Sequence, residues 1–412
     1  MFKDLSNIDR SSPVVIFGAG LSGRVVSFAL NKNKIKPSFF IDSDVSKHDQ
    51  KFYGIECISI EKLREKNFKN VNIFIAHNYI DEAVKICLMN NFNNIFTSVE
   101  ILDSIDLSEE NEYTKLYPEF TSLKLKRNFE IHKYSVLKYL SSSDTQKNDK
   151  LIMKHLDVVI TERCSMKCKD CANLMQYYEK PMNSDLDQLS KSLDRLMNNV
   201  DRLYEFRILG GDPFMNKEMH KIVNKTVGYD NVDSIVVYTN ATILPKNENL
   251  YCLKNPKVRL QITNYGANLS KKHDLLIDIL NKNDIKYVTE KVIEWDDIGK
   301  IKYEHKTHEK LQKTFDDCCA KDIFTLLDGI IYKCPVSAHG TKLKAIPFDK
   351  KYDGINLLDD YKNGELKLAL KDFYTNKNYV TACSYCKGRG YGFGSIKAAI
   401  QTKEPIKYEK IK

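Results

Sequence analysis

The sequence lacks any apolar run long enough to cross a bilayer, and its first residues, Met1 to Ser6, have neither the basic flank nor the apolar core of a signal peptide. It also lacks internal repeats and long low-complexity tracts, so nothing in it indicates a repeat architecture. We therefore expect a cytoplasmic protein with no membrane partner.

The positive charge is not gathered into a patch either. A net charge of +9 is spread as lysine runs along 412 residues, which indicates solvated surface and no nucleic-acid partner, although part of it could assist an anionic, phosphate-bearing substrate. A chain of this length, 42% hydrophobic, predicts two or three domains. Its 11 cysteines would stay reduced in the cytoplasm, which favours metal or cluster ligation over disulfides.

The start of the chain predicts a small α/β unit, over residues 1–103. The predicted elements are strand 13–17, helix 24–31, strand 38–41, strand 72–76, helix 80–89 and strand 94–96. A GxGxxG turn after the first strand is formed by Gly18, Gly20 and Gly23. The second strand ends in Asp42, where dinucleotide-binding units place an acid that binds ribose. This order predicts a Rossmann-like parallel sheet.

The segments 17–20, 40–44 and 54–59 resemble the N-terminal domains of sugar O-acyltransferases and nucleotide-sugar dehydratases. The resemblance implies a nucleotide or nucleotide sugar whose phosphate lies at the Gly18 turn, where free N–H groups favour an anion. Two alternatives stay open. The unit could serve only docking or dimerisation, and a nicotinamide dinucleotide would need a second half that so short a unit lacks.

Residues 104–150 are predicted to form a helical connector that ends in the polar stretch 141–149, where we place the domain boundary. From there to residue 315, strands and helices alternate, which predicts parallel βα units that close into a partial (β/α) barrel. The predicted elements are strand 156–160, helix 185–200, strand 204–209, helix 219–227, strand 234–239, strand 258–263 and helix 270–283. Chemistry in such folds gathers at the carboxyl ends of the strands.

Three cysteines lie in one loop directly after the first of these strands: Cys164, Cys168 and Cys171. Thiolates this close can share a metal or an iron–sulfur cluster, and three ligands leave one iron of a four-iron cluster open. A structural zinc knuckle without its fourth ligand is the alternative. The CxxxCxxC spacing after a strand resembles the radical S-adenosylmethionine (radical SAM) family, and this implies a 4Fe-4S cluster whose open iron binds the methionine part of S-adenosylmethionine.

Motifs after the next strands extend this resemblance. Residues Gly210, Gly211, Asp212 and Pro213 resemble the GGEP motif that holds the methionine ammonium, with Asp in place of Glu. Thr239 and Asn240 resemble the TNG segment near the ribose of the cofactor, and Thr263 and Asn264 are weaker candidates for ribose or adenine contacts.

A second cysteine group occupies residues 316–395 and precedes a basic tail, 396–412. Its spacing resembles the twitch domain, a half-length relative of the SPASM extension, and implies a second, auxiliary 4Fe-4S cluster held by Cys319, Cys334, Cys383 and Cys386. Cys318 fits the spacing as well as Cys319 does, and a four-cysteine zinc site is the competing interpretation.

These resemblances imply a radical SAM oxidoreductase or epimerase that acts on a carbohydrate, here a nucleotide-activated sugar, with a flavodoxin- or ferredoxin-type electron donor as partner. The spare cysteine of the 318/319 pair could return a hydrogen atom in an epimerase. A peptide-modifying maturase is the alternative enzyme, and a non-catalytic iron or redox sensor is the alternative from another class.

Overall fold

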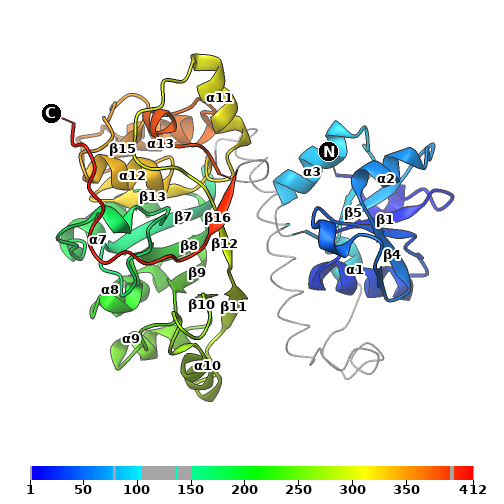
Figure 1. Cartoon of the computed structure of the whole chain (residues 1–412), viewed down its shortest axis with the longest axis horizontal. Coiled ribbons are helices and arrows are strands. Elements are labelled where there is room, and N and C mark those ends of the chain that lie inside the picture. Colours follow the sequence, from blue (N-terminus) through cyan, green and yellow to red (C-terminus); the bar gives the residue numbers. More distant parts are fainter. Residues whose placement is uncertain (1, 78–79, 104–135, 137–149, 390–393, 412) are drawn as a thin grey trace. The chain divides into compact units, whose positions relative to one another are not determined.

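The computed structural model describes residues 2–77, 80–103, 136, 150–389 and 394–411 (Figure 1). The predicted connector, 104–150, therefore falls almost wholly outside the described residues. The chain divides into two compact units, Met1–Ser143 and Asp144–Lys412, and each is described by itself. In the described ranges, no helix is both long and apolar enough to cross a membrane.

The first unit is a six-stranded sheet with helices on both faces. Its strands are β1 (Val14–Phe17), β2 (Phe39–Ile41), β3 (Lys51–Phe52), β4 (Ile55–Ile58), β5 (Asn72–Ile75) and β6 (Ile95–Thr97). The order across the sheet is β3-β4-β2-β1-β5-β6, and all neighbours are parallel except the β3–β4 pair. The helices are α1 (Leu21–Lys32), α2 (Ile60–Glu65), α3 (Ile80–Met89) and α4 (Val99–Asp103).

Every residue of β1 is buried because successive side chains enter different cores. Val14 and Ile16 pack with residues of α1 and α4, whereas Val15 and Phe17 pack with residues of α2 and α3. A strand covered on both faces reads as a continuous apolar run, which is the signal that located it in the sequence.

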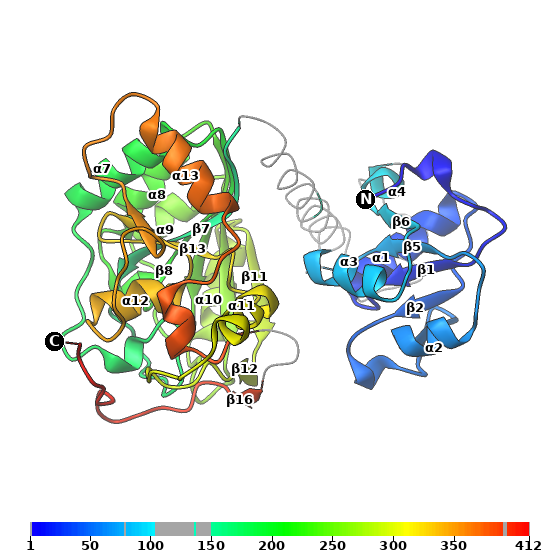
Figure 2. The same ribbon diagram turned by 90° about the horizontal axis from the view of Figure 1, so that it is seen from above.

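The second unit is built on an eight-stranded sheet (Figures 1 and 2). Its strands are β7 (Ile152–Thr161), β8 (Arg202–Gly210), β9 (Val232–Thr239), β10 (Val258–Asn264), β11 (Tyr287–Lys291), β13 (Phe324–Leu327), β14 (Ile330–Tyr332) and β15 (Gly354–Asn356). The order is β11-β10-β9-β8-β7-β13-β14-β15, parallel from β11 to β13, with β14 and β15 antiparallel. A separate two-stranded sheet pairs β12 (Glu294–Asp296) with β16 (Ser395–Lys397). The mixed α/β fold with parallel sheets is confirmed.

The two faces of this sheet differ in character. Alternate strand residues such as Val158, Ile208 and Val237 form one apolar core with residues of α7, α8, α10 and α13. The principal helices of the unit are α7 (Leu186–Met197), α8 (Met219–Val227), α10 (His273–Lys282), α11 (His308–Asp317), α12 (Pro335–Lys342) and α13 (Glu365–Thr375). The intervening residues of β7, β8 and β10, which face the other way, include charged side chains. All seven elements predicted between residues 156 and 283 are confirmed within a few residues.

Candidate functional site

The cysteine loop begins where β7 ends, at Thr161. Cys164, Cys168 and Cys171 lie together in one cluster of side chains, and Cys168 is 8% exposed. Burial raises the pKa of Cys168 to about 12, and burial together with the nearby Asp212 charge also raises the pKa of Cys164. The metal-free thiols are therefore protonated at neutral pH, and a metal must displace these protons to bind.

Within the described part of the chain, no three His, Cys, Asp or Glu side chains are gathered closely enough to hold a single metal ion. The three cysteines nevertheless fit an iron–sulfur cluster by the chemistry of the donor set, because a cluster is ligated by thiolates from several sides.

The GGDP segment, Gly210–Pro213, packs directly against the cysteine loop. The Gly211 N–H donates to the Thr161 carbonyl at 2.8 Å, and the Asp212 N–H donates to the Arg163 carbonyl at 2.8 Å. A Cβ on Gly210 would lie 2.1 Å from the Thr161 oxygen, and one on Gly211 would lie 2.0 Å from the Arg163 oxygen. Both glycines are therefore required for the loops after β7 and β8 to approach each other.

Asp212 joins these loops to the turn after β9. Its carboxylate is 1% exposed and accepts hydrogen bonds from Phe214 N at 3.0 Å, Thr239 Oγ1 at 2.9 Å and Asn240 N at 3.1 Å. Asn240 Nδ2 in turn donates to Cys164 Sγ at 3.5 Å. The sequence motif predicts that Asp212 contacts a cofactor ammonium, but here the carboxylate faces the neighbouring turn. Its structural role is to lock three loops together.

Thr263 and Asn264 end β10, and Asn264 Oδ1 accepts from Gly266 N at 2.8 Å. The next residue, Tyr265, was missed by the sequence analysis. Its ring packs edge-on against Trp295 at 5.5 Å and belongs to the side-chain cluster that holds the three loop cysteines. The available signal was an aromatic residue directly after a parallel strand, where the other candidate residues also lie.

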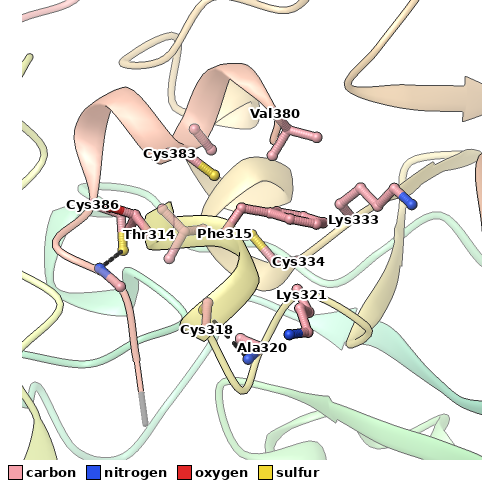
Figure 3. A pocket seen from close by; sticks show the side chains of 13 residues that line it. Thr314, Phe315, Cys318, Ala320, Lys321, Lys333, Cys334, Val380, Cys383 and Cys386 are labelled. Carbon is pink, nitrogen blue, oxygen red and sulfur yellow. Dashed lines mark hydrogen bonds between the residues drawn. The ribbon is translucent and has the colours of Figure 1, made fainter. Parts of the chain in front are cut away.

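The second cysteine group lines a cavity in another part of this unit (Figure 3). Three segments supply Cys318, Cys334, Cys383 and Cys386, and apolar side chains such as Phe315 and Val380 complete the lining. Three of the sulfurs accept backbone N–H groups, with Cys318 bonded to Ala320 N at 3.4 Å, Cys334 to Ser337 N at 3.5 Å and Cys386 to Gly388 N at 3.3 Å. Four sulfurs with N–H donors already aimed at three of them fit a thiolate-ligated centre.

The member of the adjacent pair that the structure brings to this cavity is Cys318, not the expected Cys319. Cys318 directly follows α11, and its extended backbone directs the side chain into the cavity. Cys319 is exposed and does not line the cavity, although its backbone N–H donates to the Arg389 carbonyl at 2.9 Å. Three further cysteines, Cys57, Cys87 and Cys252, are buried in apolar cores.

Two lysines beside this cavity were not found from the sequence. Lys306 Nζ donates to the Cys383 carbonyl at 3.0 Å and also to the Cys386 carbonyl, so it holds the CxxC segment. Lys333 is buried, donates to the Asn376 carbonyl at 2.7 Å, and lies over the Phe373 ring at 4.8 Å. Burial lowers the pKa of Lys333 to about 7. The Lys333 amine lies beside the C-terminal end of α13, where it donates to backbone carbonyls that have no partner within the helix.

In the first unit, the glycine turn is shaped by close contacts within the chain. A Cβ on Gly18 would lie 2.7 Å from the Ala76 oxygen, and one on Gly23 would lie 1.7 Å from the Gly18 oxygen. A Cβ on Gly20 would meet nothing within 4 Å. Close packing within the chain therefore requires glycine at positions 18 and 23. At Gly20 no neighbouring atom lies where a side chain would begin, so this side of the turn has open space.

Asp42 holds this turn. Its carboxylate accepts from Ala19 N at 2.7 Å, Asp44 N at 2.9 Å and Lys47 Nζ at 2.9 Å. Burial by itself would raise the pKa of Asp42, but these hydrogen bonds and the Lys47 charge outweigh it and keep the pKa below its usual value. A ribose at this turn, as expected from the sequence, would have to share the Asp42 carboxylate with these three donors of the protein.

The sheet face opposite α7, α8, α10 and α13 carries ion pairs that the sequence analysis also missed. Arg207 Nη2 lies 2.5 Å from the Asp157 carboxylate, and Arg259 Nη2 lies 3.2 Å from that of Glu205. The Arg207 guanidinium also lies 5.9 Å from the centre of the Tyr238 ring. These side chains come from four neighbouring strands, β7 to β10.

The site thus consists of a loop with three cysteines at the carboxyl end of a strand in a largely parallel sheet, a donor set that suits an iron–sulfur cluster. Residues 133–285 match the protein-family model described as a 4Fe-4S single cluster domain. The CxxxCxxC loop with Cys164, Cys168 and Cys171 lies inside the matched range.

Two curated proteins show local sequence similarity. The GTP 3′,8-cyclase of Clostridium acetobutylicum is 28% identical over 96 residues, which cover 22% of this chain and 29% of the relative. An uncharacterised protein of Methanocaldococcus jannaschii is 29% identical over 134 residues, 32% of this chain and 41% of the relative. The chain therefore spans less than half the length of either relative.

Solved structures are similar only in part. BtrN in complex with AdoMet and 2-DOIA is 14% identical, with 55% of this chain and 84% of that chain covered and a TM-score of 0.37. The anSMEcpe protein with bound AdoMet and a Cp18Cys peptide is 13% identical, covers 54% and 81%, and has a TM-score of 0.37. SuiB of Streptococcus suis bound to S-adenosylmethionine is 12% identical, covers 60% and 50%, and has a TM-score of 0.30.

Proposed function

We propose that this chain is a radical SAM enzyme that generates a 5′-deoxyadenosyl radical to oxidise or epimerise a carbohydrate, which we take to be a nucleotide-activated sugar. The observation that carries the proposal is the joining of three loops at the carboxyl ends of β7, β8 and β9. Asp212 bonds to Thr239 and Asn240, and Asn240 bonds to Cys164, so the cluster ligands and both motif segments form one hydrogen-bonded group.

The roles of these residues follow from their positions. Cys164, Cys168 and Cys171 would hold the 4Fe-4S cluster, and the backbone of Gly210–Pro213 would receive the methionine ammonium of S-adenosylmethionine. When bound and reduced, the cluster supplies the electron that cleaves S-adenosylmethionine to methionine and the 5′-deoxyadenosyl radical. Thr239 and Asn240 would orient the ribose, with Thr263 and Asn264 as further candidates. Asp212 would act as a positioning residue that fixes the segments around the cofactor.

The polar sheet face supports a hydroxyl-rich substrate. The pairs Asp157–Arg207 and Glu205–Arg259 present charged hydrogen-bonding groups on the side of the strands away from the apolar core. Each acid is already paired with an arginine, but carboxylates and guanidinium groups can make further hydrogen bonds, and the hydroxyl groups of a sugar would supply donors and acceptors for them.

The cavity with four cysteines favours oxidation over epimerisation. An auxiliary cluster there would accept the electron that the substrate radical loses, and with loss of the hydroxyl proton the product would be a ketone. Epimerisation instead needs a thiol that returns a hydrogen atom to the radical. Outside the two ligand sets, the exposed Cys319 is the candidate for that thiol, since Cys57, Cys87 and Cys252 are buried in apolar cores.

The test is anaerobic reconstitution followed by incubation with S-adenosylmethionine, reductant and a panel of nucleotide sugars. We expect one sugar to stimulate 5′-deoxyadenosine formation above the substrate-free rate, with no product in a Cys168→Ala control. A product two mass units lighter than the sugar would identify oxidation. In deuterated solvent, a product with the same composition as the sugar except for one incorporated deuterium would identify epimerisation. Stimulation by peptides but by no sugar would refute the carbohydrate proposal in favour of a peptide maturase.

A further inference from the structure

The segment after β16, expected as a basic tail, is built into the cysteine loop. Residues 398–402 lie beside residues 167–169, with a β-bridge between Cys168 and Gln401. Lys169 N donates to the Ile400 carbonyl at 2.7 Å, and Thr402 N donates to the Lys167 carbonyl at 2.8 Å. This last segment, drawn in red, crosses the unit from β16 to the C-terminus in Figure 1 and runs along its lower edge in Figure 2. We call residues 398–402 the strap.

Apolar contacts hold the strap where it crosses the loop. Ala398 and Ala399 are buried and pack with Met166 and Cys168. Upstream, the pairing of β16 with β12 fixes its start, and Ala398 N donates to the Ile293 carbonyl at 2.9 Å. The strap is thus anchored on both sides of its contact with Cys168.

The side chain of Gln401 reaches the Cys168 sulfur. Its Nε2 lies 3.1 Å from Cys168 Sγ and 2.8 Å from the Ala399 carbonyl oxygen, and its Oε1 lies 2.8 Å from Lys167 N. The Lys167 N–H can only donate and the Ala399 carbonyl can only accept, so these partners fix which end of the amide is oxygen. The second hydrogen of the NH₂ group must therefore point at the sulfur.

We propose that Gln401 is a positioning residue that sets the reduction potential of the cluster on this loop by donating an N–H···S hydrogen bond to the Cys168 thiolate. Reduction adds negative charge to the cluster and its thiolates, so a donor to sulfur stabilises the reduced state more than the oxidised state. The strap thereby makes the cluster easier to reduce. The inference rests on the cluster assignment within the proposed function, but on no property of the substrate.

The test measures the midpoint potential of the reconstituted full-length protein by EPR-monitored redox titration. The signal followed is the one that a Cys168→Ala variant lacks, which separates this cluster from any second one. In Gln401→Leu we expect a lower potential, with the ratio of reduced to oxidised cluster reduced about tenfold at a fixed applied potential, a shift of about 59 mV for one electron. Gln401→Glu keeps the length and the acceptor for Lys167 N but places an anion beside the sulfur, so its potential should fall further.

The matched control is Thr402→Val. Thr402 Oγ1 donates to the Lys167 and Glu404 carbonyls but touches no sulfur, so this variant weakens the strap while leaving the N–H···S bond in place. We expect an unchanged potential there. The inference would be overturned if Gln401→Leu had full iron content and an unchanged midpoint potential. It would also be overturned if Thr402→Val shifted the potential as much as Gln401→Leu does, or if the cysteine loop bound no cluster. A potential shift in a protein that cleaves no S-adenosylmethionine would instead support the inference and refute the proposed function.

Discussion

The adjacent cysteines Cys318 and Cys319 provide a sharp test of the second site, because they differ in surroundings but not in chemistry. Cys318 lines the cavity with three other cysteines and accepts a hydrogen bond from Ala320 N, whereas Cys319 is exposed. Replacing either by Ala removes one thiol from the same stretch of backbone. If the cavity holds an auxiliary cluster, only the first replacement removes one of its ligands.

The magnitude follows from counting ligands. Three loop cysteines and four cavity cysteines would hold two four-iron clusters, about eight irons per chain. Loss of one cavity thiolate leaves one iron of that cluster without its protein ligand, so after dialysis against a chelator we expect Cys318→Ala to retain about four irons, those of the loop cluster. Cys319→Ala should retain about eight.

The assay is iron and acid-labile sulfide analysis of both variants after identical anaerobic reconstitution, together with zinc analysis. Cys168→Ala provides the complementary control, since it removes the loop cluster and leaves the cavity cluster. Loss of iron in Cys319→Ala but not in Cys318→Ala would refute the ligand assignment. Loss of one zinc instead of about four irons in Cys318→Ala would retain the ligands but refute the cluster.

Two further predictions concern single residues elsewhere. Gly20→Val should destabilise the first unit only modestly, by about 1 kcal/mol, since Gly20 is the N-cap of α1 and its Cβ would meet nothing within 4 Å. It should weaken nucleotide-sugar binding at least about tenfold by calorimetry if a phosphate lies at the turn, and equal affinities would exclude the turn as the site. His339 is fully buried against Tyr178, and burial lowers its pKa to about 3, so the unfolded chain binds a proton below pH 6.5 that the folded chain does not. As the pH drops from 6.5 to 5.5, His339 therefore lowers the free energy of unfolding by up to about 1.4 kcal/mol per pH unit. Urea unfolding of His339→Phe should show a correspondingly smaller loss of stability over this range. An unchanged dependence of stability on pH would contradict this assignment.

Local patterns predicted the elements that carry the motifs, because those patterns are set by neighbours in the chain. The apolar run at the end of β7 is buried on both faces of its sheet, whereas the apolar stripe of α7 buries one side of that helix. The structure places both elements within a few residues of the prediction. The glycines of the GGDP segment were also readable from the sequence, since close approach of two loops requires them.

Contacts between distant segments could not be read in this way. Cys318 and Cys319 fit the cysteine spacing equally, and the choice depends on how the chain leaves α11. Gln401 is 233 residues from Cys168, and nothing in a lysine-rich tail signals that one of its amides meets a thiol. The pair Asp157 and Arg207 is formed only when β7 and β8 lie side by side.

Both units use the acid of their motif in the same way, and this limits what each acid can do. Asp42 accepts from Ala19 N in the glycine turn, and Asp212 accepts from Asn240 N in the turn after β9. Each carboxylate is buried and already holds three donors of the protein, so offering it to a ligand would weaken bonds that shape the site. Ligand recognition at both places should therefore depend chiefly on the backbone N–H and carbonyl groups that these acids hold in position. A conservative change such as Asp212→Asn should then alter loop geometry, and through it cofactor affinity, more than it alters any direct charge on the cofactor.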